Sequence, residues 1–353
     1  MSEGFHELTV LGTREEIGGA AKTVMFDVPQ ALSDRFQWQA GQHLSLRFTI
    51  DGKEVRRSYS ISNSPHMPQP LQVTVKRVSG GLVSNHINDT VGTGDSVEVM
   101  PPFGQFYLKP NRNLRRTHYF FAAGSGITPL FAMLHSVLLA EPWSDVRLLY
   151  GNQEADSILF RDKLAVLTKD HAGRLALRHV LSRPSMWSGF EYWRRGRIDA
   201  DAIADFINEL PPYAQDAQYY ICGPGGMNKA VRESLTSLDV PAERIHAESY
   251  GAAEDALSEV TGMAATAQIQ LSGQTHSVQI DAGQTVLEAS LNSGISPPYS
   301  CQSGVCGACR GTLVSGEAKM RARMALSNED MAASQVLACQ ALPQTPELTL
   351  KFE

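Results

Sequence analysis

The sequence predicts a multidomain protein built from an antiparallel β-barrel, a doubly wound α/β domain with a parallel sheet, and a small α+β domain. Three observations predict this: short β-prone runs near the N-terminus, alternating strands and helices in the middle, and four cysteines crowded near the C-terminus. The 353 residues suffice for two to three domains of roughly 100–200 residues each. We place the domains at residues 1–112, 113–250 and 266–353, with a linker at 251–265.

Composition excludes several classes of protein. Apolar residues make up 42% and charged residues 19% of the chain, so a sizeable core can form and disorder is not expected. The net charge of −6 argues against nucleic acid as a partner. No stretch approaches the roughly 20 apolar residues of a membrane span, and MSEGFHELTV lacks the pattern of a secretory signal. We therefore expect a cytoplasmic protein that does not insert into a membrane.

The first domain is expected to be all-β. Its β-prone runs are separated by turns that contain Gly, Pro, Asn or Asp at near-regular spacing, which is typical of a small antiparallel barrel or sandwich. Only a short helical turn near Val83–Ile87 interrupts the pattern. The runs are FHELTVL, KTVMFDV, HLSLRFTI, RRSYSIS, QVTVKRV and SVEVM.

The middle domain alternates apolar strands with helical patterns, which predicts a parallel, doubly wound sheet. The expected strands are residues 118–122, 146–150, 175–181, 217–223 and 244–250, and the expected helices are 129–140, 158–168, 199–210 and 227–238.

The last domain opens with two strands, IQLSG and HSVQI, around Gly273. A helix follows, for which Thr285 is the expected N-cap and Gly294 the expected stop. The preceding segment 251–265 is acidic, rich in Ala and Gly, and only weakly periodic. It is therefore predicted to be a linker.

The four C-terminal cysteines have the spacing C-x4-C-x2-C, and the fourth follows after 29 residues: Cys301, Cys306, Cys309 and Cys339. This is the plant-type ferredoxin spacing for a [2Fe–2S] cluster. Gly304 and Gly307 allow the backbone of a tight loop to adopt the unusual dihedral angles that it needs. The alternative is a four-cysteine zinc site, but zinc ribbons usually pair two C-x2-C knuckles. The pattern favours the iron–sulfur cluster.

A second motif, Arg57-Ser58-Tyr59-Ser60, lies on an expected strand that ends in a turn. A flavin needs an aromatic face, a cation for its pyrophosphate and a hydroxyl near N5, which Tyr59, Arg57 and Ser60 supply. R-x-Y-S alone recurs by chance. It is strengthened by Lys76 and by a Gly-rich turn that enters a helical turn, where backbone N–H groups can meet phosphate: Gly80, Gly81 and Ser84.

Two further Gly-rich turns follow expected strands of the middle domain. The first, Gly124–Pro129, allows close approach to a phosphate, and Pro129 suits the first position of a helix. It differs from the usual dinucleotide fingerprint, because Pro stands in place of the third Gly and no acidic residue closes the second strand. The second turn is Cys222–Met227. Cys222, the fifth cysteine, is otherwise explained as a small buried apolar side chain.

In this order, the motifs resemble the ferredoxin–NADP reductase superfamily in the version with a C-terminal plant-type ferredoxin domain. Within it, the chain is similar to reductase components of phenylacetyl-CoA epoxidases, and related reductases serve steroid hydroxylases, alkyl or aryl oxygenases and acyl desaturases. The stretches that carry the resemblance are FHELTV, AGQHLSLR, RRSYSIS, VKRVSGG, AAGSGITP, YICGP, PPYSCQSGVCGAC and LACQALP. The resemblance implies a β-grasp fold for the last domain.

The resemblance also implies roles for individual residues. FAD, rather than FMN, would contact the R-x-Y-S strand and the turn after Lys76, with Ser60 near N5. The nicotinamide nucleotide would lie on Gly124, Gly126, Thr128, Pro129, Cys222, Gly223 and Pro224, with Cys222 beside its reactive carbon. Glu248 and Tyr250 would close this domain near the flavin. Ser182 and Arg183 match a position where NADPH-using relatives hold the 2′-phosphate, which suits Arg, although a surface Arg beside a loop would look the same. The insertion 186–195 departs from these relatives.

The expected reaction is hydride transfer from NADPH or NADH to FAD, followed by single electrons through the [2Fe–2S] cluster to a terminal acceptor. The expected partner is a non-haem iron oxygenase, of the phenylacetyl-CoA epoxidase type or a related hydroxylase. An acyl desaturase or steroid hydroxylase is the alternative partner. Two other interpretations remain: a redox-sensing or docking module without turnover, and a quinone or dye reductase without a dedicated partner.

Overall fold

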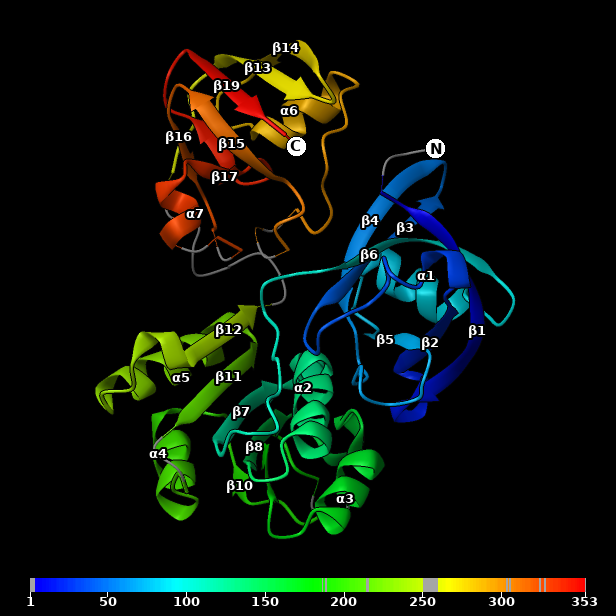
Figure 1. Ribbon diagram of the computed structural model, residues 1–353, viewed down its shortest axis with the longest axis vertical. Coiled ribbons are helices and arrows are strands. Elements are labelled where there is room, and N and C mark those ends of the chain that lie inside the picture. The colour runs from blue at the N-terminus through cyan, green and yellow to red at the C-terminus, as the bar shows by residue number, and fades with distance from the viewer. Residues whose placement is uncertain are drawn as a thin grey trace. The chain divides into compact units, whose positions relative to one another are not determined.

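The computed structural model (Figure 1) describes residues 4–185, 187, 189–213, 216–249, 260–302, 304, 306–323, 325–326 and 328–352. The chain divides into two compact units, residues 1–250 and 251–353, which are described separately below. Among the described residues, no helix is both long and apolar enough to cross a lipid bilayer.

The first unit begins with a six-stranded antiparallel sheet in the order β4-β3-β6-β1-β2-β5. One β-bulge between Val10 and Gly12 shifts the register of β1 against β2. The strands are β1 (His6–Glu16), β2 (Ala21–Asp27), β3 (His43–Ile50), β4 (Lys53–Ser60), β5 (Leu71–Lys76) and β6 (Ser96–Phe103).

The two edge strands of this sheet meet just beyond the end of β4. Ile61 forms a bridge with Val73 of β5, and Ser62 N donates to Gln72 O at 3.0 Å. Closure removes the exposed edges, and the apolar faces of the strands enclose a core that includes Leu8 and Leu44. Helix α1 (Leu82–Thr90) packs Val83 and Ile87 into this core. The expected barrel is confirmed.

The second sheet of the first unit has six parallel strands in the order β10-β9-β8-β7-β11-β12. Five match the expected strands, and the two-residue strand β10 lies within the insertion 186–195. The strands are β7 (Thr117–Ala123), β8 (Asp145–Asn152), β9 (Leu175–Leu181), β10 (Arg194–Arg195), β11 (Ala217–Gly223) and β12 (Ile245–Ser249).

Helices cover both faces of this parallel sheet (Figure 1), as expected for a doubly wound domain. One face is covered by α2 (Ile127–Ala140) and α3 (Arg161–Asp170), and the other by α4 (Ala200–Glu209) and α5 (Gly225–Ser237). Helix α2 is apolar on nearly every side, because the core that it joins also contains barrel residues: Ala21, Ala40, Phe106 and Leu108. The core beside α2 therefore joins the barrel to the parallel sheet, while the barrel keeps its own core around Leu8 and Leu44. The boundary expected at residue 112 lies in the segment between β6 and β7.

The second unit contains a mixed five-stranded sheet in the order β14-β13-β19-β15-β17 and a two-stranded sheet β16-β18. Strands β13 and β19 run parallel, and the other pairs are antiparallel. The strands are β13 (Ala265–Leu271), β14 (Gln274–Ile280), β15 (Arg310–Ser315), β16 (Ala318–Met320), β17 (Gln335–Leu337), β18 (Ala341–Pro343) and β19 (Glu347–Lys351). Residues 251–259 of the expected linker lie outside the described residues.

Helix α6 (Val286–Asn292) begins and ends where its sequence predicts. Glu288 N donates to Thr285 Oγ1 at 3.2 Å, and Thr285 N donates to Glu288 Oε2 at 2.9 Å, which forms a capping box. Gly294 has a φ of 77°, a conformation that favours glycine after a helix end. A second helix, α7 (Asn328–Ala332), follows β16.

Candidate functional site

The expected flavin motif occupies the end of β4. Because side chains alternate along a strand, Arg57 and Tyr59 point to one face and Ser58 and Ser60 to the other. Tyr59 lies opposite Leu44 of β3. Burial raises the pKa of Tyr59 above its usual value of 10, so its ring presents a neutral aromatic surface. Arg57 is exposed at the same face. The strand thus offers a ring and a cation side by side, as a flavin with its pyrophosphate requires.

The Gly-rich turn after β5 forms the N-terminus of α1. Gly81 is its N-cap, and a Cβ added at Gly81 would lie 2.4 Å from Ser84 Oγ. Gly80 has a φ of 69°, a region that side chains disfavour. Exposed N–H groups at a helix N-terminus bind anions. Lys76 ends β5 just before this turn, and burial lowers the pKa of its amine. This turn fits a phosphate.

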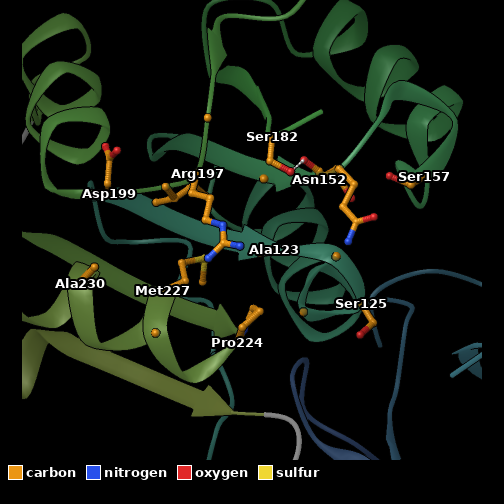
Figure 2. A pocket seen from close by; sticks show the side chains of 18 of the residues that line it. Ala123, Ser125, Asn152, Ser157, Ser182, Arg197, Asp199, Pro224, Met227 and Ala230 are labelled. Atoms are coloured by element: carbon orange, nitrogen blue, oxygen red, sulfur yellow. Dashed lines mark hydrogen bonds between the residues drawn. The ribbon is translucent and has the colours of Figure 1, made fainter. Parts of the chain in front are cut away.

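A cavity of about 880 Å³ lies at the carboxyl ends of the parallel strands (Figure 2). Its walls come from the loops that follow β7, β8, β9, β10 and β11, the position at which doubly wound sheets bind ligands. Its lining includes Lys76, Gly124, Gly126, Ser182, Gly223 and Pro224, all of them predicted site residues, and also Asn152, Gln153, Ser157, Arg197, Asp199 and Met227.

The floor of this cavity lies between β7 and β11, where the order of the strands reverses direction. Here Gly126 approaches the backbone of Cys222 so closely that an added Cβ would lie 2.0 Å from the Cys222 carbonyl oxygen. An added Cβ at Gly223 would lie 2.6 Å from Met227 Cε. The two Gly-rich turns that the sequence singles out therefore meet, and the glycines leave room for a phosphate above them.

Thr128 and Pro129 lie in the first turn of α2 and are buried. The prediction that Pro129 takes the first helical position is wrong, because the turn at Gly124–Gly126 leads directly into α2 at Ile127 and makes Pro129 its third residue. The Thr128 hydroxyl donates to Ser125 O at 2.9 Å, so it holds the first Gly-rich turn in place. Neither residue belongs to the lining of the cavity described above.

Cys222 is fully buried in β11, and its register partners are Ala122 in β7 and Glu248 in β12. Glu248 is also buried, and Asn228 Nδ2 donates to its backbone oxygen at 2.9 Å. The structure thus pairs Cys222 and Glu248 on neighbouring strands, and Cys222 directly precedes Gly223, which lines the cavity. Tyr250 lies outside the described residues.

Arg197 is a cavity residue that the sequence did not single out. Figure 2 shows its side chain extending past Ala123 toward Met227 and Pro224. It follows Gly196, directly after strand β10. Arg183, the residue predicted to hold the 2′-phosphate, is not among the lining residues. Its guanidinium donates to the side-chain oxygen of Gln153, which does line the cavity. The sequence offers no motif that points to Arg197.

The cysteine loop has the backbone that its glycines predict. Gln302, Gly304 and Gly307 have positive φ angles of 56°, 78° and 74°. Cys306, Cys309 and Cys339 are buried, and Cys301 is half-buried. Ala308 N donates to Cys306 Sγ at 3.5 Å, and Gln340 Nε2 donates to Cys339 Sγ at 3.6 Å. Such donors stabilise thiolates, the form in which cysteine binds metal.

The four thiols form two pairs. The neighbouring Cys301 side chain and burial raise the pKa of the Cys306 thiol. Cys339 and burial likewise raise the pKa of Cys309, while the hydrogen bond from Cys309 lowers the pKa of Cys339. The strongest effects on these pKa values therefore come from within Cys301–Cys306 and Cys309–Cys339, and charge interactions also link Cys309 with Cys306 and Cys339 with Cys301.

Two pairs of thiols suit a cluster of two irons, because each iron takes two cysteines. A single zinc ion would instead require three or four ligands to converge on one point. Across the part of the chain that the structure describes, no three His, Cys, Asp or Glu side chains form such a group. The donor set thus fits a [2Fe–2S] cluster better than a zinc ion.

Comparison with protein families assigns the three regions of the chain. Residues 9–107 match the oxidoreductase FAD-binding domain, residues 120–233 the oxidoreductase NAD-binding domain, and residues 269–344 the 2Fe-2S iron-sulfur cluster binding domain. The chain is 32% identical over 353 residues to one of the proteins that make up 1,2-phenylacetyl-CoA epoxidase in Escherichia coli K12, and the match covers 99% of this chain and 98% of that protein. The chain belongs to the ferredoxin–NADP reductase superfamily with a C-terminal [2Fe–2S] domain.

Two further relatives share this organisation with the reductase. The ferredoxin reductase component of 3-ketosteroid-9-alpha-monooxygenase from Rhodococcus rhodochrous is 34% identical over 98% of this chain and 96% of its own length. The solved structure of phthalate dioxygenase reductase is 25% identical, with a TM-score of 0.62, over 99% of this chain and 98% of its own.

These comparisons confirm several predictions from the sequence. The fold class, the superfamily, the oxidoreductase class and the FAD-, NAD- and [2Fe–2S]-binding domains of the reductase are all confirmed. The roles of individual residues and the domain boundaries stay predictions.

Proposed function

We propose that this reductase takes electrons from NADPH and delivers them one at a time to a terminal non-haem iron oxygenase. The observation that carries the proposal is the near full-length match to proteins whose names assign them to oxygenase systems, namely phenylacetyl-CoA epoxidase, 3-ketosteroid-9-alpha-monooxygenase and, at lower identity, glycine betaine monooxygenase. A phenylacetyl-CoA epoxidase-like or related hydroxylating oxygenase is the proposed acceptor, in the cytoplasm, where NADPH is available.

The barrel residues bind and orient the flavin. In this proposal Tyr59 packs against the ring system, Arg57 neutralises the pyrophosphate, and the α1 N-terminus at Gly81 holds phosphate. Ser60 is the hydroxyl donor near N5. When bound, FAD accepts two electrons as hydride and returns them singly, which is the chemistry that couples a nicotinamide to an iron–sulfur cluster.

The cavity residues bind and orient the nicotinamide nucleotide. The turns at Gly126 and Gly223 admit the pyrophosphate, and buried Cys222 lies beneath the position proposed for the nicotinamide. Glu248, on the neighbouring strand, supplies a carboxylate near that position. Asp199, which also lines the cavity, caps α4 by accepting from Ala202 N at 2.9 Å.

Preference for NADPH is proposed to depend on cations that line the cavity or lie beside it. Arg197 extends into the cavity and Ser182 lines it. A 2′-phosphate is a dianion, and guanidinium groups bind such oxygens in pairs. Arg183 lies next to Ser182 and contacts Gln153, another lining residue. We assign the main contact to Arg197 and a supporting contact to Arg183.

The pairs Cys301–Cys306 and Cys309–Cys339 are the proposed ligands of the two irons. The glycines at 304 and 307 let the loop wrap closely around the cluster. Ala308 N and Gln340 Nε2, which already donate to sulfur, stabilise the negative charge there and so set the reduction potential.

A spectrum of the purified protein tests this proposal. Flavin bands and a broad sulfide-to-iron absorbance are expected, and both bleach when NADPH is added without oxygen. A Cys306→Ser variant is expected to keep NADPH-dependent bleaching of the flavin and to lose one-electron transfer to an acceptor. A protein that stays colourless after anaerobic reconstitution, or that loses both reactions equally in the variant, would contradict the proposal.

A pull-down from cells that produce the reductase tests the acceptor. Recovery of a non-haem iron oxygenase that turns over in a reconstituted assay with NADPH supports the proposal. Recovery of a desaturase instead would overturn the choice of partner while leaving the reductase chemistry intact.

A further inference from the structure

Charge is unevenly distributed in the second unit. Residues 266–353 contain five basic residues, and four of them lie between positions 310 and 323, directly after the three-cysteine loop. That stretch contains a single acidic residue, Glu317, although the whole chain has a net charge of −6. Positive charge is therefore concentrated beside the cysteines.

Contacts place part of this basic stretch against the cysteine loop. Arg321 N donates to Gln340 O at 3.1 Å, next to Cys339, and Ala325 N donates to Gly304 O at 3.0 Å. Between them, Ala322 is so near that a Cβ added at Gly304 would lie 3.1 Å from the Ala322 carbonyl oxygen. The exposed residue Arg323 follows Ala322. Arg321 and Arg323 thus flank the segment that covers Gly304, and the Arg321 guanidinium donates to Gly283 O at 2.8 Å.

Two further cations lie on the other side of the loop. A depression of about 420 Å³ is lined by Gly307 and Ala308 of the loop together with Arg310, Lys351 and Asp330. Arg310 forms an exposed ion pair with Asp330 at 3.3 Å, and Glu329 is an exposed neighbour in the chain. Asp330 is therefore the carboxylate in the depression, and it offsets the charge of Arg310. Because Arg321, Arg323 and Lys351 are also present, the charge around the loop is positive.

We propose that these four residues, Arg310, Arg321, Arg323 and Lys351, form a cationic rim that docks a carboxylate-rich surface of the protein that accepts electrons from the cluster. The inference rests on the function proposed above. An acceptor must approach the loop that carries the cluster, and a rim of one sign attracts partners of the opposite sign and repels others. Guanidinium groups pair with carboxylates in a fixed geometry, so the rim also orients the partner.

The test uses two one-electron acceptors that differ in charge: native cytochrome c, which is basic, and succinylated cytochrome c, which is acidic. Each accepts one electron from the reduced reductase, which converts ferric haem to ferrous haem. At low ionic strength the acidic form is expected to react faster, and added salt should slow it. In the Arg323→Glu/Lys351→Glu double variant, the second-order rate constant for the acidic form should fall about tenfold. This is the lower end of the rate enhancement that electrostatic steering gives to association.

The matched control is Lys319→Glu. Lys319 is exposed on β16 opposite Leu342 and lies outside the rim, so Lys319→Glu, which changes the net charge as much as Arg323→Glu alone, should leave the rate for the acidic acceptor nearly unchanged, whereas Arg323→Glu alone should lower it. A second readout needs no electron transfer: the Kd of the oxidised reductase for succinylated cytochrome c should rise about tenfold in the double variant and not in the control.

Three results would overturn the proposal. The double variant could lose equal rate with both cytochromes, which would indicate damage to the cluster. It could instead slow reduction of the cluster by NADPH, which would assign the rim to the first unit of the same chain. Lys319→Glu could match the double variant, which would leave only an effect of net charge. If NADPH fails to reduce the wild-type cluster, the proposed function fails, but the binding measurement still decides whether the rim docks an acidic protein.

Discussion

Gly126 is the position at which a single methyl group should do the most damage to the nucleotide cavity. Its backbone angles, φ −59° and ψ −13°, are ordinary for any residue, so alanine introduces no conformational strain. An added Cβ, however, would lie 2.0 Å from the Cys222 carbonyl oxygen and 2.5 Å from its carbonyl carbon. Gly126→Ala therefore isolates the cost of separating two closely packed backbones.

The cost should lie at the upper end of the range for overpacking, about 3 kcal/mol of unfolding free energy. The Cys222 carbonyl cannot move aside cheaply, because β11 is held between β7 and β12 by parallel pairing on both sides. Relief thus requires a shift of whole strands. A shift of this kind also widens the floor of the cavity, so the affinity for NADP⁺ should fall about tenfold, equivalent to about 1.4 kcal/mol.

The matched control is Gly124→Ala in the same turn. Gly124 has a φ of 54°, and a Cβ added there meets no atom within 4 Å. It should cost only the strain of a left-handed residue, about 1–2 kcal/mol. Urea unfolding followed by circular dichroism gives both free energies, and calorimetry gives the Kd for NADP⁺. A Gly126→Ala protein within about 0.5 kcal/mol of the wild type would refute the reasoning.

Three further predictions concern separate parts of the chain. Arg197→Ala should raise KM for NADPH about tenfold and leave KM for NADH unchanged, because a hydrogen bond from a guanidinium to a phosphate contributes about 1.5–3 kcal/mol. Arg183→Ala should have a smaller effect on KM for NADPH. An equal rise in KM for both nucleotides would contradict the assignment. Burial lowers the pKa of His43 to about 4, so the folded protein binds fewer protons than the unfolded chain, and stability present above pH 6.5 should be lost as pH falls toward 4. A His43→Asn variant should show a shallower loss in urea unfolding at pH 7 and pH 4.5, and an unchanged slope would count against it. Thr285→Ala removes a hydrogen-bonded N-cap and should cost about 1 kcal/mol, whereas Thr285→Ser, measured in the same thermal melts, should retain most of the stability.

Several features of the site could be predicted because short stretches of sequence encode them. The turn at Gly124–Pro129, the capping box of Thr285 and Glu288, and the loop from Cys301 to Cys309 each complete their hydrogen bonds or turns within nine residues or fewer. In such stretches, the residue types dictate the backbone directly. The structure places all three where the sequence predicts them.

Arg197 could not be predicted, because its position depends on pairing between distant residues. Strand β10 lies within the insertion 186–195 and aligns Arg194 with Val180 of β9. That pairing adds a sixth strand to the sheet and carries Gly196 and Arg197 to the rim of the cavity. Two consecutive arginines give no periodicity from which a strand could be recognised. The segment 186–195 therefore positions Gly196 and Arg197 at the cavity, although none of its own described residues lines it.

Helix α1 is longer than the turn expected near Val83–Ile87, and the reason is again tertiary. Asn88 Nδ2 donates to Val75 O of β5 at 3.1 Å and to Ser84 O at 2.8 Å. Asn is a poor helix former, so its own propensity favours an earlier end. The hydrogen bond to the barrel offsets that preference and extends the helix to Thr90.

The core around α2, which contains residues of the barrel and of the parallel-sheet domain, explains how the proposed flavin and nucleotide sites are kept in register. Hydride transfer requires the reacting atoms to be held at roughly 3–3.5 Å, and small misplacements are costly. Helix α2, which follows the turn of Gly126, packs against Ala40 and Leu108 of the barrel as well as against the parallel sheet. Lys76, at the end of a barrel strand, lines the nucleotide cavity. The flavin strand and the nucleotide turns thus belong to one compact unit, whereas the cysteines, which pass on single electrons, belong to the other.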